Sequence, residues 1–529
     1  MEKFLNKAKD FGQQQVQQRQ GNTQQPMASQ PDGQNRIQPP TKQDVDRYRY
    51  HHGTNIGTLF ILEKWLTGSM FPDNANGSAE LAAAQGWVKK EGLDNARQRF
   101  EKHWREYVSD ADMDWLRDVA KCTSVRLPIG WFTLGSDWCK GTAFKDVAGV
   151  YQNAWPAVKD LVARLNQRGI ATLIDLHGLP GGANAQEHSG TNSGKTEFWS
   201  SSSDRDIATH ALCHIATEAR DMDGVLGLQL VNESEANAKG MYDWYTRVIN
   251  EISRVDTTLP LYISDAWDFS QCINWTLSHN NATAQTNPIV IDTHLYWAFS
   301  DADKAKTPQQ ITGEASNSLK ALDNKDGSVL DRGAVQAIVG EYSCVLTEDS
   351  WAKSAGTPKD QLVHGFGNAE SSRFQSRAGG CFFWTYRMDW MEGGEWGFKQ
   401  MTKAGAITPP VGLTLSVQDV QSRISHAQQG QQSARSQAIS QHCQYWDNNH
   451  PGQYEHWRFE QGWDVGFSDA MVFFGMRSQR SLNGGDRIGM LELWVLKRVR
   501  ESGMGGKFVW EFEQGVRKGV ADWYQLAGI

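Results

Sequence analysis

Short apolar runs recur along the chain between residues 54 and 386, with segments of helical pattern between them. Each run has the length of a β-strand, and several are apolar at nearly every position. Such runs are typical of strands that are buried on both faces of a sheet. The eight runs are TNIGTLFI (54–61), SVRLPIGW (124–131), ATLIDLHG (171–178), VLGLQLVNE (225–233), PLYISDA (260–266), PIVIDTHLY (288–296), AIVGEY (337–342) and GCFFWTY (380–386).

The segments between the runs predict helices. Residues 155–169 and 239–256 carry apolar side chains at helical spacing and end in a glycine or a turn. Strands that alternate with helices form a parallel sheet, and eight strands are the number that a closed (β/α)8 barrel requires. We therefore expect an α/β fold, a TIM barrel, over residues 46–410.

The pattern changes at both ends of the chain. Residues 1–45 are rich in Gln and poor in apolar positions, so we expect a disordered tail there. Residues 411–529 carry polar and amphipathic stretches of helical pattern. We favour a mostly helical C-terminal extension packed on the barrel. The aromatic stretch at 454–474 leaves a sugar-binding module as the alternative.

Composition and charge exclude several classes of protein. The apolar share of 39%, with 22 Trp, 21 Phe and 13 Tyr, is typical of a globular chain. A formal net charge of −8 and the lack of a dense Lys/Arg tract argue against a nucleic acid partner. The seven cysteines are odd in number and show no C-x-x-C spacing, which favours a reducing compartment. Since no stretch resembles a signal peptide or a membrane span, we predict a soluble, cytoplasmic protein.

Polar and aromatic residues lie at or near the C-terminal ends of the apolar runs. In a barrel these ends meet at one rim, where the active sites of this fold are built. One such residue is often only a helix cap or a hydrogen-bonded structural group, but their convergence indicates a site. The residues are Arg126, His177, Asn232, Glu233, Asp265, His294, Tyr296, Glu341 and Trp384.

The glutamates Glu233 and Glu341 suit chemistry that uses a pair of carboxyl groups. Glycoside hydrolysis needs one protonated carboxyl and one ionised carboxylate. The sequence contains no H-E-x-x-H motif, no Gly-rich phosphate loop and no G-x-S-x-G motif, so zinc peptidase, kinase and serine hydrolase chemistry lack their minimum parts. We expect no metal and no cofactor.

Neighbouring residues have predicted supporting roles in this chemistry. Asn232 would hydrogen-bond the sugar 2-hydroxyl group. Arg126 would hold Glu341 ionised, because a nearby positive charge lowers the pKa of a carboxyl group. Tyr296 would donate a hydrogen bond to the same carboxylate, and Trp384 would offer a flat apolar face to the sugar ring.

From about residue 50 to 400 the chain resembles glycoside hydrolase family 5, in particular the fungal exo-β-1,3-glucanases. The motifs that carry this resemblance follow the family's order and cover most of the predicted barrel. They are GTNIGTLFILEKWLTGSMF (53–71), VRLPIGW (125–131), DLHGLPGGANAQEHSG (175–190), LVNES (230–234), IDTHLYWAFS (291–300), GEYS (340–343) and FFWTYRMDWMEGGEWGF (382–398).

The resemblance implies roles for particular residues. Glu233 would be the acid/base and Glu341 the nucleophile of a retaining double displacement, with carboxyl groups about 5 Å apart. Glu63 matches a carboxylate that binds the terminal glucose, and Phe299 matches an aromatic residue that clamps the sugar beyond the cleaved bond. Arg126, His177, Asn232, His294, Tyr296 and Trp384 match the other active-site positions of the family.

Two positions depart from the family pattern. Ser234 stands where family members usually have a proline after the acid/base. Gln186 stands where the glucanases have a second clamping aromatic, so the preference for the β-1,3 linkage is open. The predicted substrate is therefore a β-glucan, a gluco-oligosaccharide or another glucoside.

Several functions stay open at this stage. The leading prediction is a retaining, exo-acting β-glucoside hydrolase. The alternatives are a β-glucosidase for another linkage or for a lipid glucoside, a transglycosylase, and a barrel that binds sugar without cutting it. For the enzyme we predict a bell-shaped pH profile on the acidic side of neutral.

Overall fold

Eight parallel strands close into a barrel in the computed structural model, which describes residues 37–529. The strand order follows the sequence, and pairing of β1 with β8, in which His51 lies opposite Gly380, closes the sheet. The predicted (β/α)8 TIM barrel is confirmed. The strands are β1 His51–Asn55, β2 Ser124–Gly130, β3 Ala171–Gly178, β4 Val225–Gln229, β5 Leu261–Ser264, β6 Ile289–Trp297, β7 Ala337–Leu346 and β8 Gly380–Phe383.

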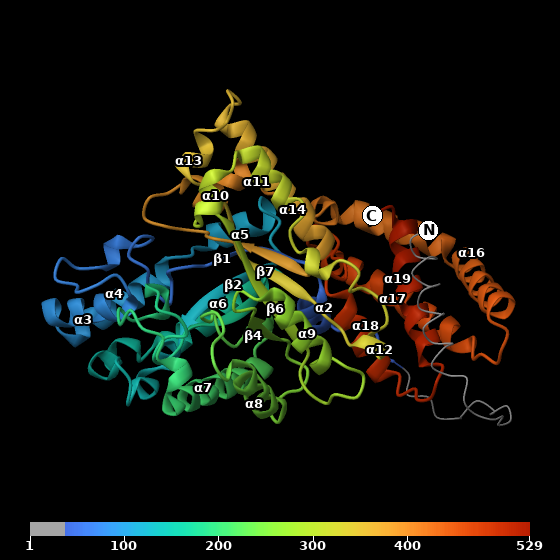
Figure 1. Cartoon of the computed structure of the whole chain (residues 1–529), viewed down its shortest axis with the longest axis horizontal. Coiled ribbons are helices and arrows are strands. Elements are labelled where there is room, and N and C mark those ends of the chain that lie inside the picture. The colour runs from blue at the N-terminus through green and yellow to red at the C-terminus, as the bar shows by residue number, and fades with distance from the viewer. Residues whose placement is uncertain (1–36) are drawn as a thin grey trace. The chain divides into compact units, whose positions relative to one another are not determined.

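Helices surround the strands, as Figure 1 shows. In α6 the buried residues recur three and four positions apart, from Ala154 to Leu165, so that one face of the helix packs on the barrel. The helices up to residue 403 are α2 Lys42–Tyr48, α3 Glu80–Glu91, α4 Leu93–Glu106, α5 Asp110–Asp118, α6 Ala154–Gln167, α7 Ser202–Arg220, α8 Met241–Ser253, α9 Phe269–His279, α10 Asp301–Ala305, α11 Pro308–Ala315, α12 Val329–Arg332, α13 Glu348–Trp351, α14 Lys359–Arg377 and α15 Phe398–Lys403.

The first strand differs from its prediction. The apolar run at 54–61 was expected to form it, but β1 has the sequence HHGTN and ends at Asn55. Burial lowers the pKa of His51 to about 3 and that of His52 to about 4, so both imidazoles are neutral. Neutral imidazoles can occupy a core when they are hydrogen-bonded, and Nδ1 of His51 lies 2.8 Å from Oγ of Ser124. The hydrophobic signal missed this strand because its buried residues are polar.

The N-terminal prediction concerns mostly residues outside the described part of the chain. The Gln-rich tail was predicted for residues 1–45, and the description begins at residue 37. Within the described residues, Thr41 caps helix α2, and Val45 on this helix is buried. Residues 42–45, which were assigned to the tail, therefore belong to helix α2.

The residues after the barrel form four long helices, α16 Val417–Asn449, α17 Trp457–Gln479, α18 Leu491–Glu501 and α19 Val509–Ala527. Helices α17 and α19 pack with their backbones in close contact. A Cβ atom at Gly466 would lie 2.0 Å from the carbonyl oxygen of Val516, and one at Gly519 would lie 2.2 Å from that of Trp463. Only glycine permits such a close approach of two backbones. Each helix has two of these glycines, four positions apart: Gly462 and Gly466 on α17, and Gly515 and Gly519 on α19.

This helical extension contacts the N-terminal ends of the barrel strands. The amide of Met490 donates to the carbonyl of Tyr48 at 3.0 Å, and the side chain of Arg477 reaches the carbonyl of Gly169, just before β3. One apolar cluster joins residues of the extension, such as Phe473 and Trp494, with residues from the strands. The extension therefore covers the end of the barrel opposite to the C-terminal strand ends.

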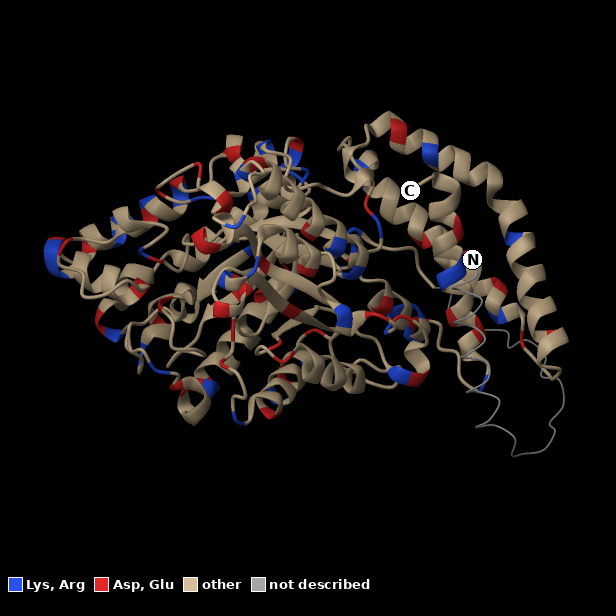
Figure 2. Cartoon of the chain, turned by 45° about the horizontal axis from the view of Figure 1, so that its top comes forward, with Lys and Arg blue, Asp and Glu red and all other residues tan. Residues whose placement is uncertain are grey.

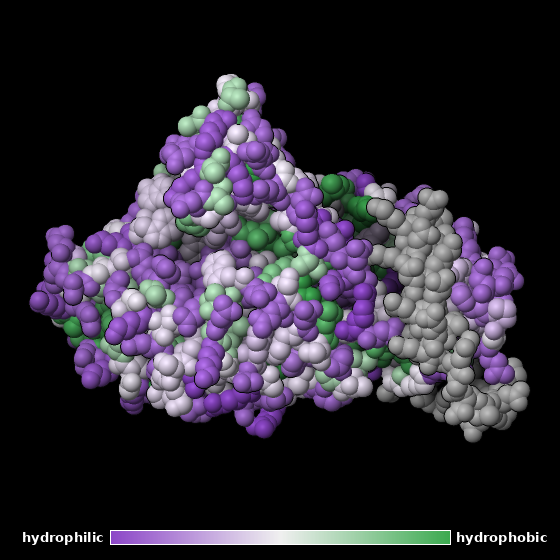
Figure 3. Space-filling view, in the orientation of Figure 1, coloured by the Kyte–Doolittle hydropathy of each residue, from purple (hydrophilic) through white to green (hydrophobic). Residues whose placement is uncertain are grey.

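The surface is mixed in character. Figure 2 shows Lys and Arg interspersed with Asp and Glu over the barrel helices and the extension. Figure 3 shows a mostly hydrophilic face on which the hydrophobic surface is confined to smaller patches. Between residues 37 and 529, no helix has the length and apolar character needed to span a bilayer.

Candidate active site

Glu233 and Glu341 lie close together at the C-terminal rim of the barrel. Glu233 follows β4 in a turn where its φ is 41°, and Glu341 lies within β7. A carboxylate oxygen of each and a ring nitrogen of His294 lie within 4.8 Å of one another. Nδ1 of His294 is 2.8 Å from Oε1 of Glu233 and 3.5 Å from Oε2 of Glu341. His294 on β6 therefore connects the two carboxylates.

Arg126 on β2 is the buried cation beneath this pair. Its guanidinium donates to Oε1 of Glu341 at 3.0 Å and to Oδ1 of Asn232 at 2.7 Å, and it pairs with Asp175 at 3.0 Å. The side chain of Arg126 is fully buried. A rigid fork of donors fixes the geometry of the groups that it contacts, so Arg126 positions Glu341 and Asn232 relative to each other.

His177 on β3 orients the amide of Asn232. Nδ1 of His177 lies 2.7 Å from Asp175, and its Nε2 lies 3.3 Å from Nδ2 of Asn232. Burial lowers the pKa of His177 well below its usual value, so the ring is neutral, donates to Asp175 and accepts from Asn232. The ring also stacks on Trp384, with 5.9 Å between centroids and 11° between planes. One of the two N–H groups of the Asn232 amide is thus directed at His177.

Aromatic side chains line one side of the carboxylate pair. The hydroxyl of Tyr296 donates to Oε2 of Glu341 at 3.0 Å. The ring of Tyr296 lies 5.5 Å from that of Phe299 and 5.8 Å from that of Trp396, between centroids. Phe299 is 67% exposed, so its face is open to a ligand.

Glu63 adds a third buried carboxyl group near the pair. Its Oε2 accepts a hydrogen bond from the indole of Trp65 at 2.8 Å, and its Oε1 is buried and has no hydrogen-bond partner among residues 37–529. Burial raises the pKa of Glu63 to about 8. An unpaired buried oxygen is costly unless a ligand satisfies it, so Glu63 is suited to bind a hydroxyl group.

The carboxyl groups of Glu233 and Glu341 titrate together. Burial raises the pKa of Glu341 to about 7, although His294 and Arg126 act in the opposite direction. Burial also opposes the ionisation of Glu233, but the hydrogen bond from His294 and the charges of nearby histidines lower its pKa to about 2. Arg126 therefore lowers the pKa of Glu341, as predicted, but by less than burial raises it. The pair holds one proton over a wide range of pH.

Four residues of the site were not identified from the sequence. Asp175 pairs with Arg126, and Asp292 lies 3.1 Å from Nε2 of His294. His188 lies 3.4 Å from Oε2 of Glu233, and Trp396 packs against Tyr296. For the two aspartates there is a signal, because each precedes a predicted site residue by two positions and therefore faces the same side of its strand. His188 and Trp396 lie in the short 3-10 helices Glu187–Ser189 and Gly394–Trp396, which are too short to show a periodicity.

Two further residues named from the sequence have other partners or surroundings than the carboxylate pair. Asp265 accepts hydrogen bonds from the side chain of Thr293 at 2.7 Å and from the amide of Trp267 at 3.0 Å, so it stabilises the turn after β5. Gln186 is exposed in the loop after β3. Within residues 37–529, neither side chain forms a hydrogen bond or an ion pair with Glu233 or Glu341.

Known families and proteins match this chain over most of its length. Residues 88–386 match the family Cellulase (glycosyl hydrolase family 5), and residues 427–527 match the family Glucan 1,3-beta-glucosidase 3 C-terminal domain. Glucan 1,3-beta-glucosidase 3 of Schizosaccharomyces pombe is 30% identical over 488 residues, which are 92% of this chain and 97% of that protein. An uncharacterized glycosyl hydrolase of Saccharomyces cerevisiae is also 30% identical, over 91% of this chain and 93% of that protein.

Solved structures agree on the fold. The crystal structure of rutinosidase from Aspergillus niger superimposes with a TM-score of 0.51 at 16% identity, over 69% of this chain and 99% of that chain. Identity at this level reports the fold alone, and the fold is the barrel described above. With the family match over more than half of the sequence, the chain belongs to glycoside hydrolase family 5 and is a glycoside hydrolase.

Proposed function

We propose that this chain is a retaining, exo-acting β-glucoside hydrolase in which Glu233 is the acid/base and Glu341 the nucleophile. The observation that carries the proposal is that one carboxylate oxygen of Glu233 lies within 4.8 Å of one of Glu341. Retaining enzymes hold their two carboxyl groups about 5–5.5 Å apart, whereas inverting enzymes leave about 6.5–9.5 Å for a water molecule. The short separation supports direct attack by a carboxylate on the sugar.

The reaction would proceed in two displacements. First, Glu341 attacks the anomeric carbon while Glu233 gives its proton to the departing glycosidic oxygen. A glycosyl ester of Glu341 forms, and the bond to the leaving group breaks. Then Glu233, now ionised, takes a proton from water, and the water oxygen displaces Glu341 from the anomeric carbon. The two inversions restore the original configuration.

The hydrogen bonds support this division of roles. Arg126 and Tyr296 both donate to Glu341, and an ionised carboxylate accepts such bonds best. In the site without substrate, burial raises the pKa of Glu341 to about 7, which favours the proton on that residue. The reaction, however, needs the proton on Glu233. His294 contacts both carboxylates, so it offers a path by which the proton crosses when the substrate binds.

The substrate is proposed to be a β-1,3-glucan, a gluco-oligosaccharide or another β-glucoside. β-1,3-Glucan is supported by the similarity to glucan 1,3-beta-glucosidase 3 of Schizosaccharomyces pombe. The unpaired oxygen of Glu63 is suited to hold the hydroxyl groups of a terminal glucose, which favours exo action. The exposed ring of Phe299 would contact the sugar or aglycone beyond the cleaved bond.

Covalent trapping would test the mechanism. A 2-deoxy-2-fluoro-β-glucoside with a good leaving group slows both steps, so the glycosyl ester accumulates. We expect peptide mass spectrometry to find the label on Glu341, and NMR to find that the first sugar product is the β anomer. A first product of α configuration, or a label on another residue, would overturn the retaining mechanism.

A screen of purified protein would test the substrate. β-1,3-, β-1,4- and β-1,6-linked gluco-oligosaccharides and alkyl or lipid glucosides would be compared by kcat/KM. Release of glucose from the non-reducing end would support exo action, and release of longer fragments would contradict it. Sugar transfer to a second saccharide at high donor concentration would identify a transglycosylase instead.

A further inference from the structure

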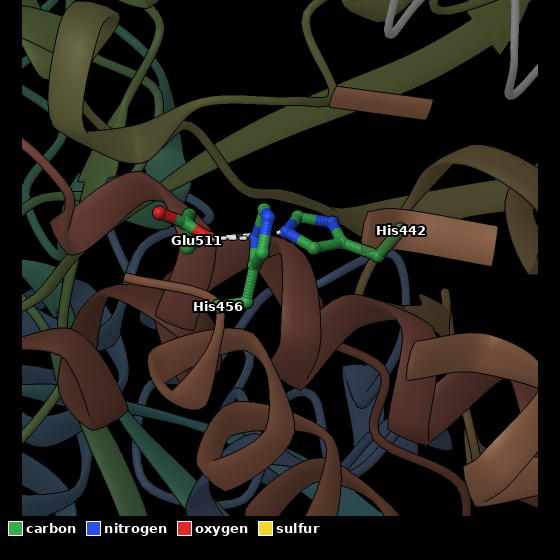
Figure 4. Close-up of side chains that lie close together, drawn as sticks. All are labelled: His442, His456 and Glu511. Carbon is green, nitrogen blue, oxygen red and sulfur yellow. Dashed lines mark hydrogen bonds and ion pairs between the residues drawn. The ribbon is translucent and has the colours of Figure 1, made fainter. Parts of the chain in front are cut away.

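A second cluster of histidine and carboxylate side chains lies in the extension, outside the barrel. His442 is on α16, His456 directly precedes α17, and Glu511 is in the first turn of α19. One ligand atom of each residue lies within 4.8 Å of the other two, and Figure 4 shows both imidazoles directed at the carboxylate. We propose that these three residues bind a divalent transition-metal ion of the Zn²⁺ type.

The distances suit such an ion. Nε2 of His442 and Nδ1 of His456 lie 3.1 Å and 2.8 Å from the same oxygen, Oε2 of Glu511. Tetrahedral Zn²⁺ with bonds of about 2.0–2.1 Å holds neighbouring ligand atoms about 3.3 Å apart. The ion can therefore enter between the carboxylate and the two imidazoles if each nitrogen moves away from the oxygen by a few tenths of an ångström.

The charge of Glu511 also favours a cation. Its side chain is completely buried, and Oε1 accepts from the amide of Glu455 at 2.8 Å. Over residues 37–529, its ion-pair partners are His442 and His456, and neither Lys nor Arg is among them. A buried carboxylate needs a compensating charge, which a bound metal would supply.

The surroundings hold both imidazoles in place. Nε2 of His456 lies 3.3 Å from Oδ1 of Asp447, and a carboxylate on the far nitrogen of a metal-binding histidine is the usual arrangement. The ring of His442 stacks on Phe459 with 3.9 Å between centroids and 14° between planes. The side chain of His456 is 22% exposed, which leaves access for the ion and for water as a fourth ligand.

The ion would connect segments that are distant in the sequence. It would join α16, the start of α17 and the first turn of α19, so its binding would stabilise the packing of the extension. The alternative is that the cluster is only a hydrogen-bonded clamp between two histidines and a glutamate. The two interpretations differ in whether added metal binds to the protein and raises its stability.

Metal content of the full-length protein would test the site. After treatment with a chelator, the protein would be titrated with Zn²⁺ and dialysed, and bound metal would be measured by mass spectrometry. We expect about one Zn²⁺ per chain in the wild type and its loss in His456→Gln and His442→Gln. Glutamine keeps an N–H donor for Glu511 but replaces the imidazole ligand.

Three control variants locate the binding. His426→Gln replaces an exposed histidine on the same helix α16. Cys443→Ser removes the thiol beside His442, and Glu341→Gln alters the other cluster of His and carboxylate groups, at the barrel rim. Each of these variants should keep the bound Zn²⁺. If one of them loses it while His456→Gln keeps it, the proposed site is wrong.

Thermal unfolding gives a second measurement. Zn²⁺ at about 100 times its Kd would raise the ratio of folded to unfolded protein by about 100-fold. We expect a rise in melting temperature with Zn²⁺ in the wild type and none in His456→Gln. If Zn²⁺ leaves the wild type unchanged while His456→Gln lowers its melting temperature, the cluster is a hydrogen-bonded clamp, and the proposal is overturned.

Discussion

The two ends of the barrel use buried charge in opposite ways. At the C-terminal rim the carboxyl groups of Glu63, Glu233 and Glu341 converge, and one oxygen of Glu63 has no hydrogen-bond partner in the described part of the chain. The extension, which covers the other end, contains a buried ion pair that is fully satisfied: both oxygens of Asp469 accept from Arg498 at 2.7 Å. Unsatisfied and crowded acids lower stability but can act on a substrate. Paired charges and close packing serve stability.

Replacing the proposed nucleophile should separate chemistry from stability most clearly. Glu341→Gln keeps an acceptor for Arg126 but cannot form the glycosyl ester, so we expect kcat/KM to fall on the order of 10⁴-fold or more, with the melting temperature nearly unchanged. Hydrolysis of an aryl β-glucoside would measure the loss. Glu348→Gln, an exposed glutamate on α13, is the control and should keep full activity. Full activity in Glu341→Gln would exclude its role.

A glycine in the extension should show the reverse. Gly466→Ala places a Cβ where Val516 O lies 2.0 Å away, so α17 and α19 must separate. We expect a loss of about 3 kcal/mol in the free energy of unfolding, with kcat/KM of the folded enzyme unchanged. Urea unfolding would measure this loss of stability.

The control is Gly365→Ala on α14. A Cβ atom at this position has no atom within 4 Å, so we expect the variant to be more stable by up to about 1 kcal/mol. Equal effects of the two variants would contradict the close packing.

The pH profile should report the shared proton of the rim. The pKa of Glu233 is about 2 and that of Glu341 about 7, so the pair holds one proton between these values. Above pH 7 the last proton leaves and no general acid remains, so kcat/KM should fall about tenfold per pH unit. Near pH 2 both groups become protonated and no nucleophile remains. Rates measured from pH 3 to 9, with the melting temperature as control, would test this. Activity that rises into alkali would contradict it.

The smallest expected effect concerns the exposed aromatic ring at the rim. Phe299→Ala removes a stacking face that is 67% exposed. We expect about 1 kcal/mol of binding to be lost, or about a fivefold rise in KM for gluco-oligosaccharides, with stability unchanged. Phe299→Tyr keeps the ring and should retain the wild-type KM. A KM that is unchanged in Phe299→Ala would place the substrate elsewhere.

The sequence predicted the barrel better than it predicted the details of the site. Seven of the eight apolar runs coincide with strands, but β1 was displaced because His51 and His52 are buried polar residues. The predicted residues from Arg126 to Trp384 do meet at one rim. Asp175 and Asp292 were missed, although each faces the same side of its strand as the predicted residue two positions later, His177 or His294.

The sequence by itself determined the strand count, the helical character of the extension and the candidate carboxylates, because these depend on local periodicity and on residue type. Only the tertiary structure decided that His294 contacts both Glu233 and Glu341, and that Glu341 is more strongly affected by burial than by Arg126. It also brought His442 and Glu511 together. Distances and burial depend on how distant segments pack, and no local pattern encodes them.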